Sequence, residues 1–323
     1  MRKIKYSFII PVKEINNNLR QCILKILAIK RSDYEIIVYP DSATQEKWKK
    51  TRQIASGPAG PAYKRTLAIG DAKGKILIFI DDDAYPKSNF LDILDKDFAD
   101  KEVVAVGGPA ITPPTDSFWQ RVSGAVFLSV LSGGFPERYL SLGKKKFVDD
   151  WPSVNLSVRK KSFVEVGGFN SPFWSGEDTK FCLDLINKTG GKILYDPDLI
   201  VWHHRREGLF IHLDQVGRYG LHRGYFAKRY PQTSFRFKYF LPTLFFLFVV
   251  FGNIASLFLK PVLKFYLFGL SIYFLSLVKV FFDMKKYEKD TSVIYYSLFY
   301  VPFTHLVYGA KFIQGLLSKE LKR

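Results

Sequence analysis

The first third of the chain alternates short apolar runs with amphipathic stretches. The apolar runs predict strands over residues 6–12, 34–40, 75–80 and 103–110. Apolar residues at helical spacing predict helices over residues 19–30, 43–54, 61–72 and 88–98. Strands that are apolar throughout are typical of a parallel sheet with helices on both faces. The pattern therefore predicts a Rossmann-like α/β fold whose ligands bind at the carboxyl ends of the strands.

The pattern changes in the last third of the chain. Residues 239–259 form a run of 21 residues without a charge, which is long enough to cross the hydrocarbon core of a bilayer. Two further apolar segments follow at 265–282 and 291–317. We therefore expect a membrane domain of about three helices over residues 239–317.

The remaining residues divide into two parts. Residues 1–112 hold the predicted strands and helices, whereas residues 113–235 are less regular and end in a basic segment beside the membrane. An apolar stretch within the second part, residues 117–135, is interpreted either as a core helix or as a helix at the membrane interface.

The chain is strongly basic, with 48 Lys and Arg against 30 Asp and Glu and a net charge of +18. The segment 203–238, just before the first apolar helix, holds eight basic residues and two acids. Basic residues beside a span mark the cytoplasmic side, so we expect a multi-pass protein of the cell membrane whose preceding domain is cytoplasmic. Attraction to anionic lipid then explains part of the net charge, and no motif that reads nucleic acid is found.

Three consecutive aspartates follow the third predicted strand, in the sequence ILIFIDDDAYP at residues 76–86. Residues two apart in a strand point the same way, so Asp81 and Asp83 are predicted to project together, with Asp82 turned away. Paired carboxylates are ligands for Mg²⁺ or Mn²⁺, and such a cation also binds a substrate diphosphate. An acidic surface turn is the alternative interpretation.

Several segments, in order along the chain, resemble the family 2 glycosyltransferases with their GT-A fold. The matching segments are SFIIPVKE, EIIVYPDS, GPAYKRTLAIGDAKGKILIFIDDD, VNLSVRKKSFVEVGGF and SGEDTKFCLDLINKTGGKILYDPDLIVWHH. Each piece is common, but the combination and its order are specific. The resemblance implies a GT-A domain followed by C-terminal membrane helices, similar to bacterial glycosyltransferases that build exopolysaccharides or lipid-linked glycans. Residues 1–112 would then be the half that binds the nucleotide-sugar donor, and residues 113–235 the catalytic half that binds the acceptor.

The resemblance also implies roles for individual residues. Asp81, Asp83 and His203 would bind the cation, with His204 as the alternative to His203. In the GED sequence, Asp178 would be the general base, with Glu177 beside it. An acid at a helix N-terminus is the structural alternative for this pair.

Donor and acceptor contacts follow in the same way. The donor would be held by five residues, namely Pro11, Glu14, Asp41, Arg65 and Asp82. Two departures weaken this set: PD stands where the family usually has an acidic pair, and Arg65 is followed by Thr66 where Asn is common.

The acceptor would be held by Trp151, Trp174, Tyr219, Arg205 and Arg206. The sequence QVGRY at 215–219 resembles the Q-x-x-R-W motif of polymerising members, but Tyr219 replaces the Trp and the sequence after it is closer to non-polymerising relatives. We therefore expect a single addition.

These expectations describe a membrane-anchored, metal-dependent, inverting glycosyltransferase. It would move a sugar from a nucleotide-diphosphate donor to a lipid-linked or glycan acceptor. Two alternatives stay open: a polyprenyl-phosphate sugar synthase of the dolichol-phosphate-mannose type, and an inactive membrane scaffold that binds nucleotide sugars.

Overall fold

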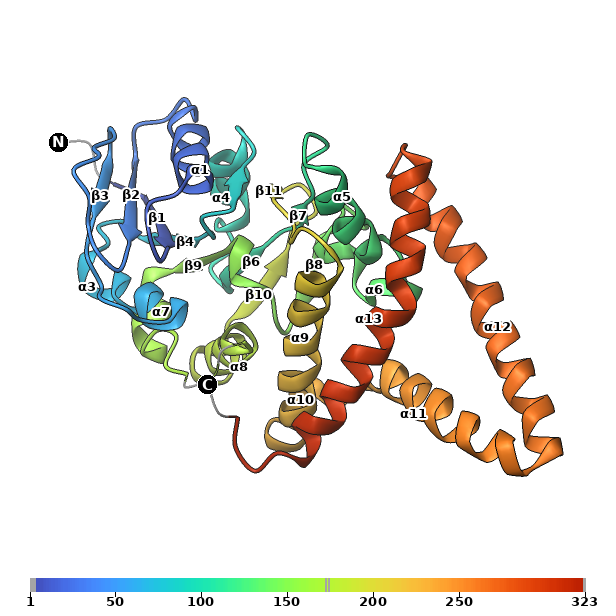
Figure 1. Ribbon diagram of the computed structural model, residues 1–323. Coiled ribbons are helices and arrows are strands. Elements are labelled where there is room, and N and C mark those ends of the chain that lie inside the picture. The colour runs from blue at the N-terminus through green and yellow to red at the C-terminus, as the bar shows by residue number, and fades with distance from the viewer. Residues whose placement is uncertain (1–3, 172, 174, 322–323) are drawn as a thin grey trace. The chain divides into compact units, whose positions relative to one another are not determined.

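The computed structural model describes residues 4–171, 173 and 175–321, and the chain divides into two compact units (Figure 1). The sheet unit comprises Met1–Ile111 and Leu140–His204, and the helical unit comprises Thr112–Tyr139 and Arg205–Arg323. The chain thus leaves the sheet unit after Ile111 and returns to it at Leu140. The division expected from the sequence, with boundaries at residues 112 and 235, keeps residues 113–139 and 140–204 in one part, whereas the structure assigns them to different units.

The sheet unit is built on one eight-stranded sheet. Its strand order is β3 (Thr51–Gln53), β2 (Tyr34–Tyr39), β1 (Tyr6–Pro11), β4 (Ile76–Phe79), β9 (Leu156–Arg159), β6 (Val103–Gly107), β10 (Lys192–Tyr195) and β8 (Lys146–Val148). Strand β1 pairs in parallel with both β2 and β4, and β6 pairs in parallel with β10. Strand β9 runs antiparallel between β4 and β6. The mostly parallel sheet is confirmed; the antiparallel insertion was not predicted.

Both faces of this sheet are buried, which explains why its strands are apolar throughout. In β1, Phe8 and Ile10 enter one core with residues of α1 (Asn17–Leu27) and α4 (Phe90–Asp97). Ile9 points to the opposite face. The core on that face is completed by α2 (Pro61–Thr66), α3 (Ala68–Asp71), α7 (Lys160–Val166) and α8 (Glu177–Thr189).

A small second sheet follows the aspartate motif. Its strand order is β5 (Ala84–Pro86), β11 (Val201–His203) and β7 (Ala110–Ile111). Strand β11 runs antiparallel to β5, with His203 opposite Ala84. This pairing brings residue 203 next to the aspartates although more than a hundred residues separate them in sequence.

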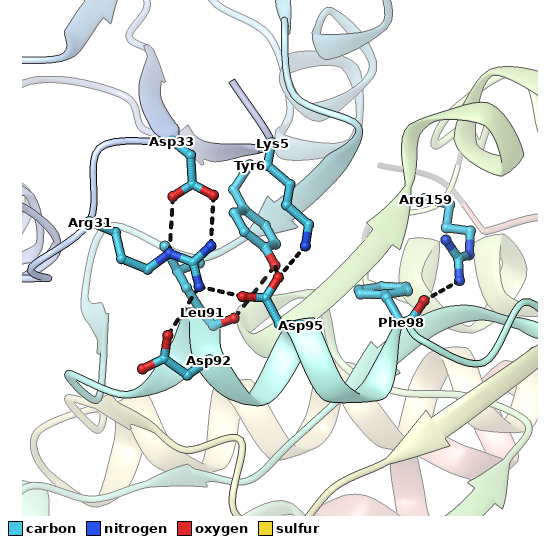
Figure 2. A network of polar contacts seen from close by, with 9 residues as sticks. All are labelled: Lys5, Tyr6, Arg31, Asp33, Leu91, Asp92, Asp95, Phe98 and Arg159. Carbon is cyan, nitrogen blue, oxygen red and sulfur yellow. Dashed lines mark hydrogen bonds and ion pairs between the residues drawn. The ribbon is translucent and has the colours of Figure 1, made fainter. Parts of the chain in front are cut away.

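A network of charged groups fastens α4 to the beginnings of β1 and β2 (Figure 2). The Arg31 guanidinium donates to Asp33 at 2.6 Å, to Asp92 at 3.0 Å and to Asp95 at 2.5 Å. Asp95 also accepts from the Tyr6 hydroxyl at 2.5 Å and from Lys5. Burial alone would raise the pKa of Asp95, but the hydrogen bonds from Lys5, Tyr6 and Arg31 outweigh it and hold this pKa at about 2.

The helix predicted over residues 43–54 is wrong. Only β3 is regular there, and β3 pairs in parallel with β2. The Gln53 side chain accepts from the Thr44 N–H at 2.9 Å and donates to the Glu46 carbonyl at 2.7 Å. These bonds occupy backbone groups that a helix would use, because polar side chains compete locally for them.

The helical unit contains the long helices of the C-terminal third. They are α9 (Leu209–Arg229), α11 (Phe237–Phe258), α12 (Lys260–Lys285) and α13 (Thr291–Leu317). By length and composition, α11 and α12 are long and apolar enough to cross a membrane; within the described residues α13 is not found among such helices. The stretch 117–135 is broken into α5 (Phe118–Ala125), η1 (Val126–Leu128) and α6 (Val130–Gly133).

Candidate active site

Two of the predicted site aspartates follow the carboxyl ends of the strands on either side of β1 in the sheet unit. Asp41 follows β2, and Asp81 follows β4. Strand β4, however, ends at Phe79, and Asp81–Asp83 form a turn in which the Ala84 N–H donates to the Asp81 carbonyl at 3.2 Å. The argument from strand alternation is therefore wrong, because these residues are not in a strand.

Each of the three aspartates has its own polar partner. Asp81 accepts from Arg65 at 2.7 Å, and Asp82 accepts from the Asn16 side chain at 2.6 Å. The Asp83 carboxylate lies 3.2 Å from Nε2 of His203. Burial raises the pKa of Asp82 to about 6, and the charges of its two neighbours add to the shift.

Asp81, Asp83 and His203 are the residues predicted to bind Mg²⁺ or Mn²⁺. Among the described residues, no group of three or more His, Cys, Asp or Glu side chains could by itself hold a metal ion. A cation that shares a substrate diphosphate needs only one or two carboxylates from the protein. Asp83 is 8% exposed with the His203 imidazole beside it, and Asp81 lies two residues away. This donor set fits a cation whose remaining ligands come from a bound diphosphate and water.

Arg65 connects the aspartate turn to the start of α8. Arg65 is 3% exposed. Its guanidinium donates to Asp81, and its Nη1 atom lies 3.5 Å from a Glu177 carboxylate oxygen. Its Nε donates to no described residue. A buried guanidinium between two carboxylates fixes the position of both, since its planar donors reach in two directions.

Glu177 and Asp178 form the first turn of α8, after Gly176 with a φ of 102°. Glycine adopts this left-handed conformation without strain. Both acids therefore lie at the N-terminus of α8, which is the positive end of the helix dipole. Burial raises the pKa of Asp178, opposed by the charge of Arg65 and by hydrogen bonds from Ser153. Burial also raises the pKa of Glu177, with the Asp178 charge adding to the shift. The helix-terminus interpretation is thus correct, and it is compatible with a catalytic role.

One oxygen of Asp178 has no hydrogen-bond partner among the described residues. The Oδ1 atom is buried and accepts no hydrogen bond from the described part of the chain. Buried polar atoms nearly always have partners, so an exception calls for an explanation. A substrate hydroxyl would satisfy this oxygen.

Lys64 is a buried residue of the donor side that the sequence reasoning missed. Its ammonium group, on a residue 2% exposed, pairs with Asp41 and donates to the Val12 carbonyl at 2.6 Å. Lys64 thereby links the loop after β1 to the loop after β2. Pro11 is buried at the end of β1, and Glu14 is exposed in the loop after it. The sequence offered one indication that Lys64 belongs to the site, which is its position directly before Arg65, a predicted donor contact.

Comparison with known proteins bears directly on this site. Residues 7–163 match the model of the family described as glycosyl transferase family 2. These residues form a family 2 glycosyltransferase domain. The pre-mycofactocin glycosyltransferases of two Mycobacterium tuberculosis strains, CDC 1551 / Oshkosh and ATCC 25618 / H37Rv, are each 27% identical over 175 residues, which is 54% of this chain and 36% of theirs. The chain thus matches only about a third of the length of these curated relatives.

The fold of the family 2 domain agrees with a solved structure. The mannosyltransferase PcManGT from Pyrobaculum calidifontis, in complex with GDP-Man and Mn²⁺, is similar with a TM-score of 0.65 and 15% identity, over 98% of this chain and 88% of that one. The predicted GT-A fold is confirmed. The family match ends before Glu177, Asp178 and His203, so their roles depend on the geometry described above.

The residues predicted to bind the acceptor are dispersed. Trp151 is 3% exposed in the family 2 domain and donates to the Gly108 carbonyl at 2.8 Å, a core position that favours a packing role. Trp174 lies outside the described residues. Arg205, Arg206 and Tyr219 belong to the helical unit, where the Arg205 Nε donates to Thr112 at 3.0 Å and its guanidinium stacks on Tyr139. Acceptor binding by these residues stays a prediction.

Proposed function

We propose that the chain transfers a sugar from a nucleotide-diphosphate donor to a hydroxyl of a lipid-linked or glycan acceptor, with inversion at the anomeric carbon. The observation that carries the proposal is the buried Arg65, which joins Asp81 of the aspartate turn to Glu177 beside Asp178. A transferase must hold its donor and its general base at a fixed distance and orientation. A guanidinium that contacts both parts of the site would provide this.

Asp81, Asp83 and His203 would hold a divalent cation at the donor diphosphate. The cation would offset the charge that develops on the leaving nucleoside diphosphate. The similar mannosyltransferase structure contains GDP-Man and Mn²⁺, which supports this assignment. Lys64 and Asp41 would shape the neighbouring nucleoside side of the site.

Asp178 would act as the general base. Its Oδ1 would accept the proton of the acceptor hydroxyl as that oxygen forms the new bond to the anomeric carbon and the bond to the diphosphate breaks. The raised pKa of Asp178 makes it a stronger base than an exposed aspartate. A single displacement of this kind inverts the configuration.

The buried base also bears on the acceptor. A lipid phosphate is already ionised and needs no base, whereas a hydroxyl does. An Asp178 oxygen that is buried and accepts no hydrogen bond from the described residues therefore favours a hydroxyl acceptor over a polyprenyl phosphate.

Membrane association is the remaining part of the proposal. Helices α11 and α12 satisfy the length and composition of membrane spans, and the basic segment 203–238 precedes them. Basic residues favour the cytoplasmic side, so the acceptor would be met at the cytoplasmic face.

The test is a screen of nucleotide-sugar donors in membranes that contain the protein, with nucleotide release as the readout. We expect release with one donor class, dependent on Mn²⁺ or Mg²⁺ and increased by a lipid-linked sugar more than by polyprenyl phosphate. Stimulation by polyprenyl phosphate alone would favour the synthase alternative. No release and no donor binding with any sugar nucleotide would refute a transferase.

A further inference from the structure

Helix α13 runs beside helix α9 over almost the whole length of α9. Near the start of α9, His212 Nε2 lies 3.0 Å from the Thr304 hydroxyl. Near its end, Lys228 donates to the carbonyl of Ser318, just beyond α13. The two helices therefore run parallel, and the whole of α9 lies beside the second half of α13.

The backbones of the two helices touch. A Cβ atom placed on Gly224 of α9 would lie 2.0 Å from the Phe312 carbonyl oxygen, and one on Gly315 of α13 would lie 1.9 Å from the Leu221 carbonyl oxygen. No side chain or lipid tail fits between backbones at such separations. Wherever α13 lies with respect to a membrane, α9 must lie with it.

Helix α9 is too charged to enter hydrocarbon. Asp214 and Arg218 form an ion pair of 2.7 Å near the middle of the helix, with side chains 60% and 57% exposed. Lys228 and Arg229 follow in its last turn. Exposed charges at the depth of the bilayer centre are strongly unfavourable. Lys311, exposed on α13 itself, adds another charge.

The pair α11 and α12 differs from α9 in its exposed surface, although α11 also touches α13, where a Cβ on Gly309 would lie 2.4 Å from the Pro242 carbonyl oxygen. Large apolar side chains stand exposed along both helices, among them Phe251, Phe258 and Phe268. The two helices pack on each other, as Phe245 stacks on Tyr273 at 4.0 Å. The basic residues stand near the helix ends, Lys260 and Lys264 where the helices join and Lys279 to Lys286 at the other end. Apolar flanks between basic ends match a bilayer with anionic headgroups.

We infer that contact with bilayer hydrocarbon is confined to the α11–α12 hairpin and that α13 does not cross the membrane. The inference rests on the proposed membrane association and replaces the three expected spans with one hairpin. Its consequence is that residues before and after α13 lie on the same face of the membrane.

Single cysteines test this consequence. Lys289→Cys and Lys319→Cys place a thiol at an exposed residue on either side of α13. The native Cys22 and Cys182 are both 0% exposed, and the unmodified chain measures their background. Intact cells that express each full-length variant are treated with a membrane-impermeant maleimide, before and after permeabilisation. Labelling after permeabilisation gives full reactivity, and nucleotide release from the same membranes reports on activity.

We expect the two cysteines to behave alike in intact cells, with labelling within about twofold of each other after normalisation to the permeabilised sample. Both protected or both labelled supports the inference; both labelled would in addition contradict the proposed cytoplasmic orientation. Labelling of one and more than tenfold protection of the other overturns the inference, and it does so even where nucleotide release persists and the proposed activity stands.

Discussion

The two units of the chain hold their elements together by different means. In the sheet unit, buried charges bridge loops and helices, as in Lys64 with Asp41 and Arg65 with Asp81. In the helical unit, the main contact between α9 and α13 is backbone against backbone at Gly224. A site that handles a charged substrate needs charges fixed in direction, whereas the contact between α9 and α13 needs small residues. The helical unit also contains ion pairs, such as Arg121 with Glu288. We therefore expect the removal of a charge to have its largest effect in the sheet unit, and an added methyl group to have its largest effect at the contact between α9 and α13.

The largest effect is expected from removing one carboxylate charge in the sheet unit. Asp178→Asn should lower transfer by about 10²–10⁴-fold, because an amide cannot accept the hydroxyl proton. Binding of the donor with Mn²⁺, measured by calorimetry, should persist. Asp83→Asn should instead weaken that binding, since it removes a ligand.

The matched control is Asp184→Asn, on the same helix α8, where Asp184 pairs with Lys180. This variant should keep its activity within a factor of two. Full transfer by the Asp178 variant would exclude that residue as the base.

The next effect concerns shape in the helical unit. Gly224→Ala should lower the free energy of unfolding by about 1–3 kcal/mol, because the new methyl group would force the backbones of α9 and α13 apart. In the sheet unit, a Cβ on Gly70 of α3 meets no atom within 4 Å, so Gly70→Ala should raise the free energy of unfolding by up to about 1 kcal/mol. Thermal unfolding in detergent compares the two, and equal losses would contradict the assigned contact.

A smaller effect is expected at the buried lysine of the donor side. Lys64→Met leaves Asp41 without its partner and should raise the KM for the donor about tenfold, equivalent to about 1.4 kcal/mol, with kcat little changed. Lys64→Arg should restore part of the affinity. The exposed Lys161→Met serves as control. A fall in kcat at constant KM would place Lys64 in the chemical step instead.

The smallest effect concerns stability and pH. The pKa of Asp95 is lowered to about 2 in the fold, so its ion pairs contribute stability above about pH 4, and this contribution is lost as the pH falls toward 2. Asp95→Asn should therefore cost about 1 kcal/mol at neutral pH and less at pH 3. Urea unfolding at both values is the measurement. Glu102→Gln, which breaks the exposed pair with Lys192, is the control and should change the free energy of unfolding at neutral pH by less than about 0.5 kcal/mol. A pH-independent loss would mean that packing, rather than charge, is what Asp95 supplies.

The sequence by itself determined the local elements and the residue types of the site. Apolar runs located β1, β2, β4 and β6. Short motifs, each only a few residues long, predicted the aspartates, Asp178 and His203 as site residues through the family resemblance. Local patterns of this kind depend on the alternation of buried positions, which the chain displays directly.

Only the tertiary structure decided how these pieces meet. Arg65 contacts Glu177 across more than a hundred residues, β9 inserts between β4 and β6, and Lys64 is buried against Asp41. The aspartates form a turn instead of continuing the strand, and α13 belongs with the charged α9 in spite of its apolar composition. Such contacts depend on packing between segments far apart in the chain, and no local pattern of residues specifies them.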